Sequence, residues 1–174
     1  INELTSSKLL PNVKYLIKEL DLKKNKFSKI IKIGRTHTQD ATPITLGDEF
    51  SAFSSQIKSS LKRIVLAKKE LSFIAQGGTA VGSGINAPKN FDRVFCQFLN
   101  KITKNKYKPS LNKYEAIATH DSLVNFSNAL KILSISLLKI INDIRLLASG
   151  PRSGIGELVL PTNEPGSSIM PGKV

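Results

Sequence analysis

Apolar residues recur every three or four positions in several stretches of the chain, which is the spacing of one buried face of an α-helix. The first stretch covers about residues 1–25, and the second begins after Pro43. Thr45 is placed to cap the second helix, with Asp48 three residues further on. A weaker pattern predicts a shorter helix over roughly 90–103.

The fourth periodic stretch is the longest, because no Gly or Pro occurs from about Glu115 to Ser149. As one helix it would be about 50 Å long. A rod that is apolar on more than one side needs more than one neighbour, so we expect a bundle shared between subunits, with a two-helix hairpin within one chain as the alternative. The main seam consists of Leu123, Phe126, Leu130, Leu133, Leu137, Ile140, Ile144 and Leu147. The second apolar set consists of Ile132, Ile135, Leu138 and Ile141.

Composition favours the same fold class. Of the 174 residues 40% are hydrophobic, but only 6% are aromatic and Trp is absent, so burial depends on Leu, Ile and Val. Strand-type alternation is limited to a few residues near 30–33 and 155–160. We therefore predict an all-α, long-helix bundle, with 1–174 forming part of one central helical domain. The chain begins at Ile1 without Met and stops inside an apparent loop, so we expect a fragment of a longer protein.

The net charge of +13 could attract nucleic acid, anionic lipid or acidic small molecules. The cations are scattered along the chain, which is more typical of a solvated surface than of a binding patch. A basic helical nucleic-acid-binding protein is the remote alternative, and it would bind DNA in a salt-sensitive way.

Cys96 is the single cysteine, so it cannot form an internal disulfide, and a reducing compartment is expected. Its neighbours Phe95 and Phe98 favour a buried side chain over a nucleophile. No run of about 18 uninterrupted apolar residues is visible, so we expect no membrane partner, and no secretory signal is visible in these residues, with a targeting peptide outside them as the open alternative.

Reactive groups gather in the three breaks between helices. The first break, 34–43, contains Arg35, Thr36, His37 and Asp40. A histidine titrates near neutrality and can transfer protons in both directions, although a polar loop with one His is more often only a loop.

The second break, 77–88, is rich in glycine, and Gly82-x-Gly84-x-x-Ala87 formally matches a dinucleotide-binding fingerprint. We reject that interpretation because a helical pattern precedes the motif where a strand is required and Pro88 follows it at once. The glycines instead predict a close turn that brings backbone near a ligand or another helix.

The third break runs from Gly150 to the end of the chain and includes Ser167, Ser168 and Lys173. Such a loop can close over a small anion, offering backbone N–H groups and an ammonium to a carboxylate, and a serine held there can act as a base. A flexible connector is the alternative. His120-Asp121 and the Asn142–Arg145 segment are interpreted mainly as polar contacts or ion pairs within the bundle.

Five segments together resemble class II fumarate hydratase (fumarase) of the aspartase/fumarase superfamily, in the order and roughly the spacing of that family. They are KIGRTHTQDATPITLGDEF at 32–50, GGTAVGSGINAP at 77–88, EAIATHDSLV at 115–124, NDIRLLASGPRSGIGE at 142–157 and LPTNEPGSSIMPGKV at 160–174. The resemblance implies a long helical bundle, a homotetramer with active sites assembled from three subunits, and reversible hydration of fumarate to L-malate in the tricarboxylic acid cycle. It implies no metal and no organic cofactor, and a location in the bacterial cytoplasm or, in a eukaryote, the mitochondrial matrix.

The same resemblance assigns roles to individual residues. His37 would be the catalytic histidine that works with a bound water, and Ser167 would be the base that removes the proton next to a carboxylate of malate. The implied substrate-binding residues are Thr36, Ser168, Lys173 and the backbone at Val174.

Aspartate ammonia-lyase or another lyase of the same superfamily is the alternative activity. Aspartases share the Gly-Ser-Ser-x-Met-Pro loop but typically carry Gln at the position of His37 and Ala at that of Gly172. Thr38 and Asp48 depart from the usual Leu and Gln of fumarases, and we expect them to alter packing rather than chemistry. An upstream Ser-Ser-Asn segment, an Asn beyond Val174 and the Glu that partners the histidine lie outside these residues, so the fragment alone should be inactive.

Overall fold

The structure, a computed structural model, describes residues 1–170 and 172. Two compact units divide the chain, Ile1–Leu133 and Ser134–Val174, and the boundary falls within the last helix. Helices dominate the described residues, and the strands form two small two-stranded sheets. The predicted all-α class is confirmed.

The N-terminal helix predicted over 1–25 is confirmed, but it contains a wider turn. Helix α1 (Asn2–Leu4), the π-helical segment η1 (Thr5–Leu9) and α2 (Leu10–Lys26) follow one another without a gap. Pro11 occupies the start of α2 and lacks the N–H that would bond one turn back. A π turn directly before a proline gives the ring room that an α turn would not.

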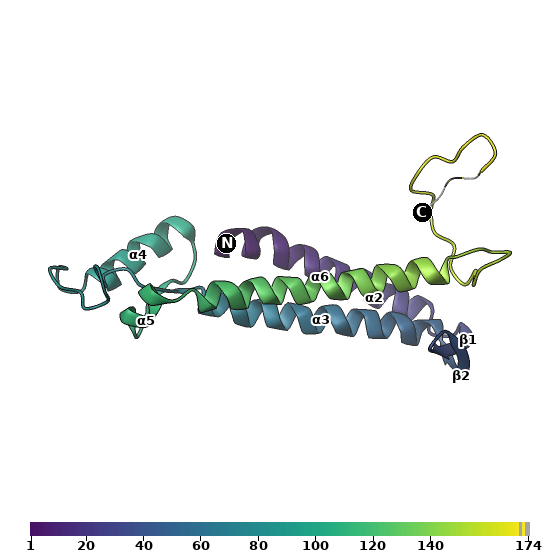
Figure 1. The fold of residues 1–174 in the computed structure, drawn as a ribbon, viewed down its shortest axis with the longest axis horizontal. Coiled ribbons are helices and arrows are strands. Elements are labelled where there is room, and N and C mark those ends of the chain that lie inside the picture. The colour runs from purple at the N-terminus through teal and green to yellow at the C-terminus, as the bar shows by residue number, and fades with distance from the viewer. Residues whose placement is uncertain (171, 173–174) are drawn as a thin grey trace. The chain divides into compact units, whose positions relative to one another are not determined.

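Helix α3 (Leu46–Glu70) packs beside α2, and the two are joined by a hairpin at one end (Figure 1). The predicted cap is confirmed: the Asp48 N–H donates to Thr45 Oγ1 over 3.1 Å, and Thr45 N–H donates to an Asp48 carboxylate oxygen over 2.9 Å. Phe50 makes edge-to-face contacts with Phe27 and Phe53. The most deeply buried apolar residues of the two helices are Val13, Ile17, Leu20, Leu46, Phe50, Phe53, Ile57, Ile64 and Ala67.

The segment between α2 and α3 was predicted as a loop, and that prediction was wrong. It forms an antiparallel hairpin of β1 (Ile31–Thr36) and β2 (Gln39–Thr45). The alternation near residues 30–33 indicated the start of β1, but its partner strand carries no clear alternation. No strand is assigned over 155–160, where alternation was also noted.

Beyond α3 the chain forms a smaller helical region. Strands β3 (Phe73–Ile74) and β4 (Lys108–Pro109) pair in parallel and flank α4 (Phe91–Thr103), the helix predicted over 90–103. Cys96 is buried in α4, as predicted, and burial raises the pKa of its thiol. Helix α5 (Lys113–Ala118) is tied to α4 by an ion pair of 2.7 Å between Lys113 and Asp92.

The long rod predicted from Glu115 to Ser149 is interrupted. Helix α5 ends at Ala118, Thr119 is extended (φ −127°, ψ 164°), and α6 runs over Asp121–Leu147. The His120 carbonyl accepts the N–H groups of Leu123 (2.9 Å) and Val124 (3.1 Å), so a new helix starts there. The helix ends here without Gly or Pro, and the β-branched side chain of Thr119 is compatible with the extended backbone that this residue adopts.

Helix α6 buries one side and leaves apolar residues on another. Phe126, Ala129 and Leu133 are buried, whereas the second apolar set is exposed: Ile132, Ile135, Leu138 and Ile141 are 40%, 56%, 60% and 53% exposed. Among the described helices α6 alone is long and apolar enough to span a membrane by length and composition, a test that helices of soluble bundles also pass. The exposed residues fit the expectation that this helix needs further neighbours.

We predict that Gly47→Ala destabilises the protein, although alanine is normally about 1 kcal/mol better than glycine inside a helix. A Cβ at Gly47 would lie 2.7 Å from the Lys24 carbonyl oxygen and 2.8 Å from Ser28 Cα, and backbone atoms cannot move aside cheaply. Chemical denaturation of the full-length protein should show a loss of about 1–3 kcal/mol. Ser55→Ala, at an exposed position of the same helix, should change stability by less than about 0.5 kcal/mol. Equal effects of the two substitutions would contradict the packing argument.

Candidate active site

His37 lies at the tip of the β1–β2 hairpin. Thr36 and Gln39 form the last pair of the ladder, and the turn residues His37 and Thr38 have φ of 52° and 63°. A two-residue hairpin turn of this hand is normally built from Asn or Gly, and other residues cost on the order of 1–3 kcal/mol there. The Thr38 hydroxyl donates to the His37 carbonyl over 2.6 Å. The turn therefore holds Thr36 and His37 on an exposed tip despite unfavourable backbone angles.

A bulge interrupts the ladder below the tip. Ile33 pairs with Pro43 and Arg35 pairs with Asp40, so β2 has one more residue than β1 in this interval. Gly34 lies in the interval, and a Cβ there would be 2.8 Å from the Thr42 carbonyl oxygen. The glycine permits this close approach, and bulges increase the local twist of a hairpin.

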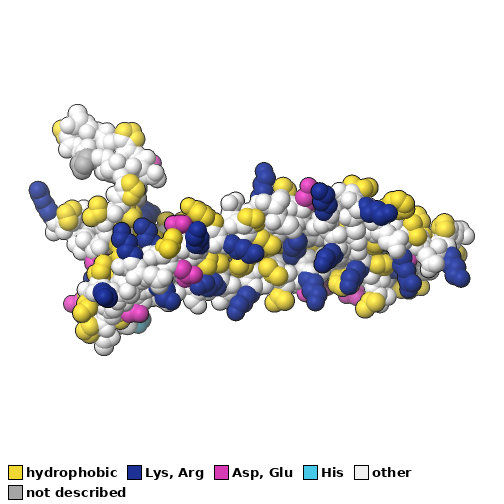
Figure 2. All heavy atoms as spheres, turned by 180° about the vertical axis from the view of Figure 1, so that it is seen from behind, with side chains coloured by type: hydrophobic (Ala, Val, Ile, Leu, Met, Phe, Trp, Pro, Cys, Tyr) yellow, Lys and Arg dark blue, Asp and Glu magenta, His cyan; other side chains and the backbone are white. Residues whose placement is uncertain are grey.

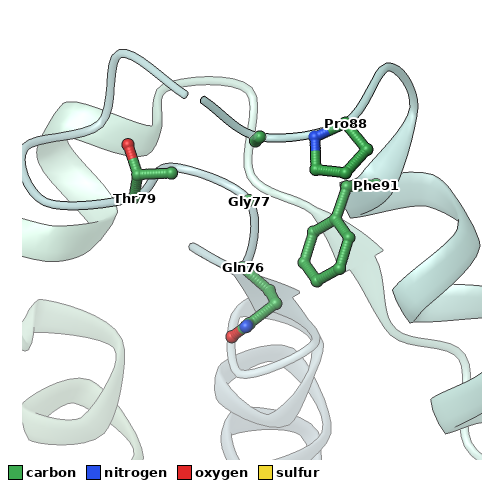
Figure 3. Close-up of a pocket in the computed structure, with 6 residues that line it drawn as sticks. Gln76, Gly77, Thr79, Pro88 and Phe91 are labelled. Carbon is green, nitrogen blue, oxygen red and sulfur yellow. The ribbon is translucent and has the colours of Figure 1, made fainter. Parts of the chain in front are cut away.

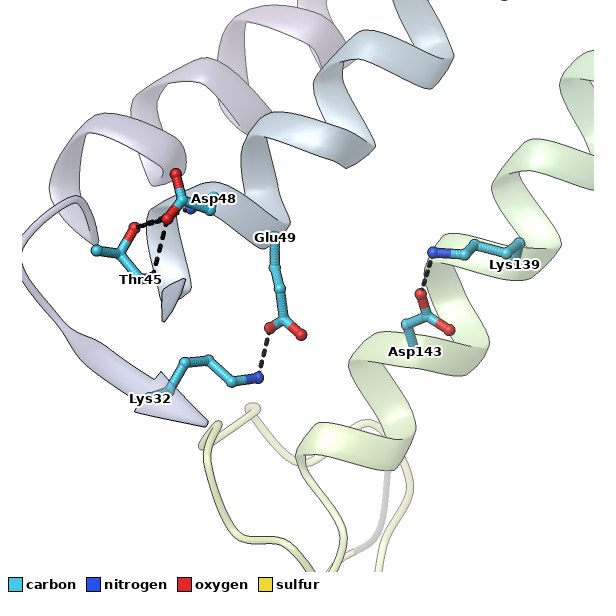
Figure 4. A network of polar contacts seen from close by, with 6 residues as sticks. All are labelled: Lys32, Thr45, Asp48, Glu49, Lys139 and Asp143. Carbon is cyan, nitrogen blue, oxygen red and sulfur yellow. Dashed lines mark hydrogen bonds and ion pairs between the residues drawn. The ribbon is translucent and has the colours of Figure 1, made fainter. Parts of the chain in front are cut away.

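The base of the hairpin is tied to the first turn of α3. Leu46 N–H donates to the Ile30 carbonyl over 2.8 Å, and Gly47 N–H donates to the Phe27 carbonyl over 3.0 Å. Figure 4 shows a side-chain link beside these bonds, in which the Lys32 ammonium lies 2.7 Å from Glu49 Oε2. This pair was not predicted from the sequence, where its one sign is a lysine between the apolar residues 30–31 and 33 of a strand-like stretch.

Asp48 completes this junction. Hydrogen bonds from the Thr45 backbone N–H and hydroxyl hold the pKa of the Asp48 carboxyl below its usual range. A carboxylate in the first turn also interacts favourably with the positive end of the helix dipole. Asp48 therefore acts in the local structure of the hairpin and helix, as expected for this departure from the fumarase pattern.

The glycine-rich segment 77–88 approaches other helices. A Cβ on Gly82 (φ 109°) would lie 2.5 Å from the backbone nitrogen of Tyr114 in α5, and one on Gly77 (φ 91°) would lie 3.0 Å from Asp92 Cβ in α4. The predicted close turn is confirmed, in the form that brings backbone against a helix. A cavity of about 240 Å³ lies beside it and is lined by Gln76, Gly77, Thr79, Ala87, Pro88 and Phe91. Figure 3 draws these lining residues.

The chain after α6 folds back onto the end of that helix. The N–H groups of Glu157 and Leu158 donate to the Leu147 carbonyl over 2.8 and 3.1 Å, and Gly156 N–H donates to the Ser149 carbonyl over 2.7 Å. These bonds satisfy carbonyls that would otherwise be unpaired at a helix C-terminus. The second unit therefore has a structured start to the segment that leads to the two serines.

Ser167 and Ser168 lie in an exposed turn. The Met170 N–H donates to the Ser167 carbonyl over 3.3 Å, and the Ile169 N–H points to Ser167 Oγ at 3.4 Å. Lys173 and Val174, the other predicted substrate-binding positions, lie outside the described residues. Thr36 and His37 are neighbours in the first unit, and Ser167 and Ser168 are neighbours in the second unit.

The other candidate groups have structural contacts. Asp143 is paired with Lys139 one helical turn away in α6 (Figure 4), which confirms the interpretation of that segment as a site of ion pairing. His120 is exposed, and its carbonyl starts α6. Among residues 1–170 and 172, no three or more His, Cys, Asp or Glu side chains are grouped so as to hold a metal ion.

A protein-family model described as "Lyase" matches residues 2–174, and the chain belongs to this lyase family. The resemblance to class II fumarate hydratase is confirmed by individual relatives. The chain is 55% identical over 170 residues to "Fumarate hydratase class II" of Rickettsia bellii, covering 98% of this chain and 37% of that protein. It is 53% identical over 169 residues to "Fumarate hydratase, mitochondrial" of Dictyostelium discoideum, covering 97% of this chain and 35% of that protein.

The fold is also similar to solved structures. The crystal structure of recombinant class II fumarase from Schistosoma mansoni matches with a TM-score of 0.93 and 40% identity, over 99% of this chain and 40% of that one. The helical fold predicted from the five segments is therefore that of the fumarases. The chain spans 37% of the length of the Rickettsia relative.

We predict that Asp48→Ala lowers the melting temperature of the full-length protein at pH 7 and that the difference shrinks in acid. A carboxyl whose pKa is lowered in the folded state stabilises that state above its unfolded pKa of about 3.9, and the contribution is lost as the pH falls through the folded pKa. Thermal melts between about pH 7 and pH 3 measure the difference. Ser55→Ala changes no titratable group, so its melting temperature should differ from that of the parent by the same amount at every pH. If the melting-temperature difference between Asp48→Ala and the parent is as large at about pH 3 as at about pH 7, the charge of the carboxylate does not contribute to stability.

Proposed function

We propose that the full-length protein is a fumarate hydratase that interconverts fumarate and L-malate, as in the tricarboxylic acid cycle. The observation that carries the proposal is the pair of exposed turns, one presenting Thr36 and His37 and the other presenting Ser167 and Ser168. Each turn lies in a segment that resembles a fumarase block. The similarity to proteins named fumarate hydratase over nearly the whole chain supports the same activity.

The residue types suit the chemistry. Removal of the C–H proton next to a carboxylate of malate leaves that carboxylate with additional negative charge, and the proton goes to the base, which we assign to Ser167. Preorganised N–H donors and a nearby cation stabilise such charge as it develops. Ser168, Lys173 and the backbone at Val174 supply these groups in the proposal.

His37 completes the site in the proposal by orienting the water that is lost from malate or added to fumarate, while Thr36 contacts a substrate carboxylate. A histidine is suited to this role because its ring can exchange a proton near neutral pH. The site uses only protein groups and water, with no metal or organic cofactor.

We further propose a homotetramer in which each active site combines residues from three subunits. The exposed apolar side chains of α6, which include Ile135, Leu138 and Ile141, support packing against other copies. A location in the bacterial cytoplasm, or in the mitochondrial matrix of a eukaryote, is consistent with the bacterial and mitochondrial relatives.

Two alternatives make different predictions. An aspartate ammonia-lyase would release ammonia from aspartate, but the histidine at position 37 favours a hydratase. A nucleic-acid-binding protein would need a concentrated basic surface, whereas Figure 2 shows Lys and Arg side chains spread among other residues over the face that it draws. We therefore propose that the protein binds neither nucleic acid nor membrane.

We predict that His37→Asn and Ser167→Ala each lower kcat/KM for malate by about 10²–10⁴-fold, because each removes a group that transfers or orients a proton. The assay follows fumarate absorbance with the full-length oligomer, after its size and melting temperature are matched to the parent. The control variants are His120→Asn and Ser55→Ala, at exposed positions outside the site, and they should retain activity. Parent-like turnover by both site variants would refute the assignment.

We predict that the full-length protein turns over malate and fumarate but releases no ammonia from aspartate. The same preparation is tested with each substrate at equal concentration. Ammonia release at a rate comparable to malate turnover would favour the ammonia-lyase activity. Failure to act on any of the three compounds would count against the lyase assignment as a whole.

A further inference from the structure

The Lys32 side chain is almost fully buried although lysine is among the residues least often found inside a protein. It is 6% exposed, and its partner Glu49 is 26% exposed. An ammonium loses its hydration when it is buried, so it must be paired and hydrogen-bonded to remain charged. The 2.7 Å contact with Glu49 provides that partner.

The pair joins the hairpin to a helix. Lys32 lies in β1, opposite Ile44 of β2, and Glu49 lies in the first turn of α3. Backbone hydrogen bonds from Leu46 and Gly47 attach the turn before β1 to α3, and the Thr45–Asp48 cap attaches the end of β2. The Lys32–Glu49 contact lies farther along β1 and links the body of the strand to α3 (Figure 4).

We propose that Lys32 and Glu49 are a positioning pair that sets the angle of the β1–β2 hairpin on α3 and thereby the place of Thr36 and His37 in the active site. This inference rests on the proposed function of those two residues. Neither member of the pair touches substrate in this proposal. Both act through the hairpin.

A small rotation at the base of the β1–β2 hairpin displaces the residues at its tip. His37 is five residues beyond Lys32, or about 16 Å along a strand. A rotation of roughly 6° at the base would move the tip by about 1.7 Å over that length, and a misplacement of about 1 Å can cost on the order of 10²-fold in rate. Among the described residues the His37 side chain has no hydrogen-bond or ion-pair partner, so within this chain its position depends on the hairpin.

The test replaces Lys32 by Met, which keeps the length of the side chain and removes the charge, in the full-length protein. We expect kcat for malate to fall by about 10–100-fold in the folded oligomer, well below its melting temperature. Lys32→Arg keeps a cation and should recover most of the activity. Glu49→Gln should also lower kcat, and the double variant should lose little more than Lys32→Met, because partners in one interaction are not additive.

The matched control is Lys139→Met, which removes the lysine of the exposed Lys139–Asp143 pair in α6 (Figure 4). Exposed pairs within one helix contribute little, so kcat should stay within about twofold of the parent. Hydrogen exchange gives a second readout that does not depend on turnover. The amides of residues 33–42 should exchange faster in Lys32→Met than in the parent, and not in Lys139→Met.

The outcomes separate the two proposals. A lower melting temperature with unchanged kcat and unchanged exchange at 33–42 would overturn the positioning role and leave an ordinary stabilising pair. Loss of activity in Lys32→Arg as large as that in Lys32→Met would also overturn it, since charge would not matter. If the parent itself does not turn over malate, the proposed function fails, and the exchange experiment alone decides whether the pair holds the hairpin.

Discussion

The contact between the first turn of α3 and the end of α2 is the constraint on which the candidate active site depends. The two backbones approach so closely that a Cβ on Gly47 would lie within 3 Å of main-chain atoms of Lys24 and Ser28. The same helical turn donates backbone hydrogen bonds to Phe27 and Ile30, so the chain leaves α2 at a fixed place and in a fixed direction. The hairpin must then leave and rejoin this junction, which determines where its tip can lie.

The helices could be predicted from the sequence because their signal is local and repeated. The stripe of α3 agrees with the buried residues from Leu46 to Ile64, and Thr45 and Asp48 form the predicted cap. The break at Thr119 could not be predicted in the same way, since neither Gly nor Pro marks it and the apolar spacing resumes beyond it. The hairpin was missed because β2 is mostly exposed and therefore needs no alternation of apolar and polar residues.

The candidate site was predicted by another route. A single histidine in a polar segment is weak evidence, and Thr36, His37, Ser167 and Ser168 became candidates through their resemblance to fumarase segments. Lys32 and Glu49 lie in the same 32–50 segment, but the resemblance assigns no role to either residue. The burial of the Lys32 side chain depends on residues distant in the sequence, such as Glu49 in α3, and such contacts are a tertiary feature. Residues that carry chemistry are therefore easier to find in this sequence than those that hold them in place.

The exposed apolar residues of α6 link stability to catalysis under the proposed assembly. Side chains such as Ile135 and Leu138 are more than half exposed in the single chain, and their burial between subunits would supply part of the free energy of association. In the proposed assembly the hairpin of one subunit and the serine turn of another contribute to the same site. Burial of these apolar side chains and completion of the site would then be one event, so a polar substitution at Ile135 or Leu138, which touch no substrate in the proposal, would lower activity by lowering the population of the oligomer.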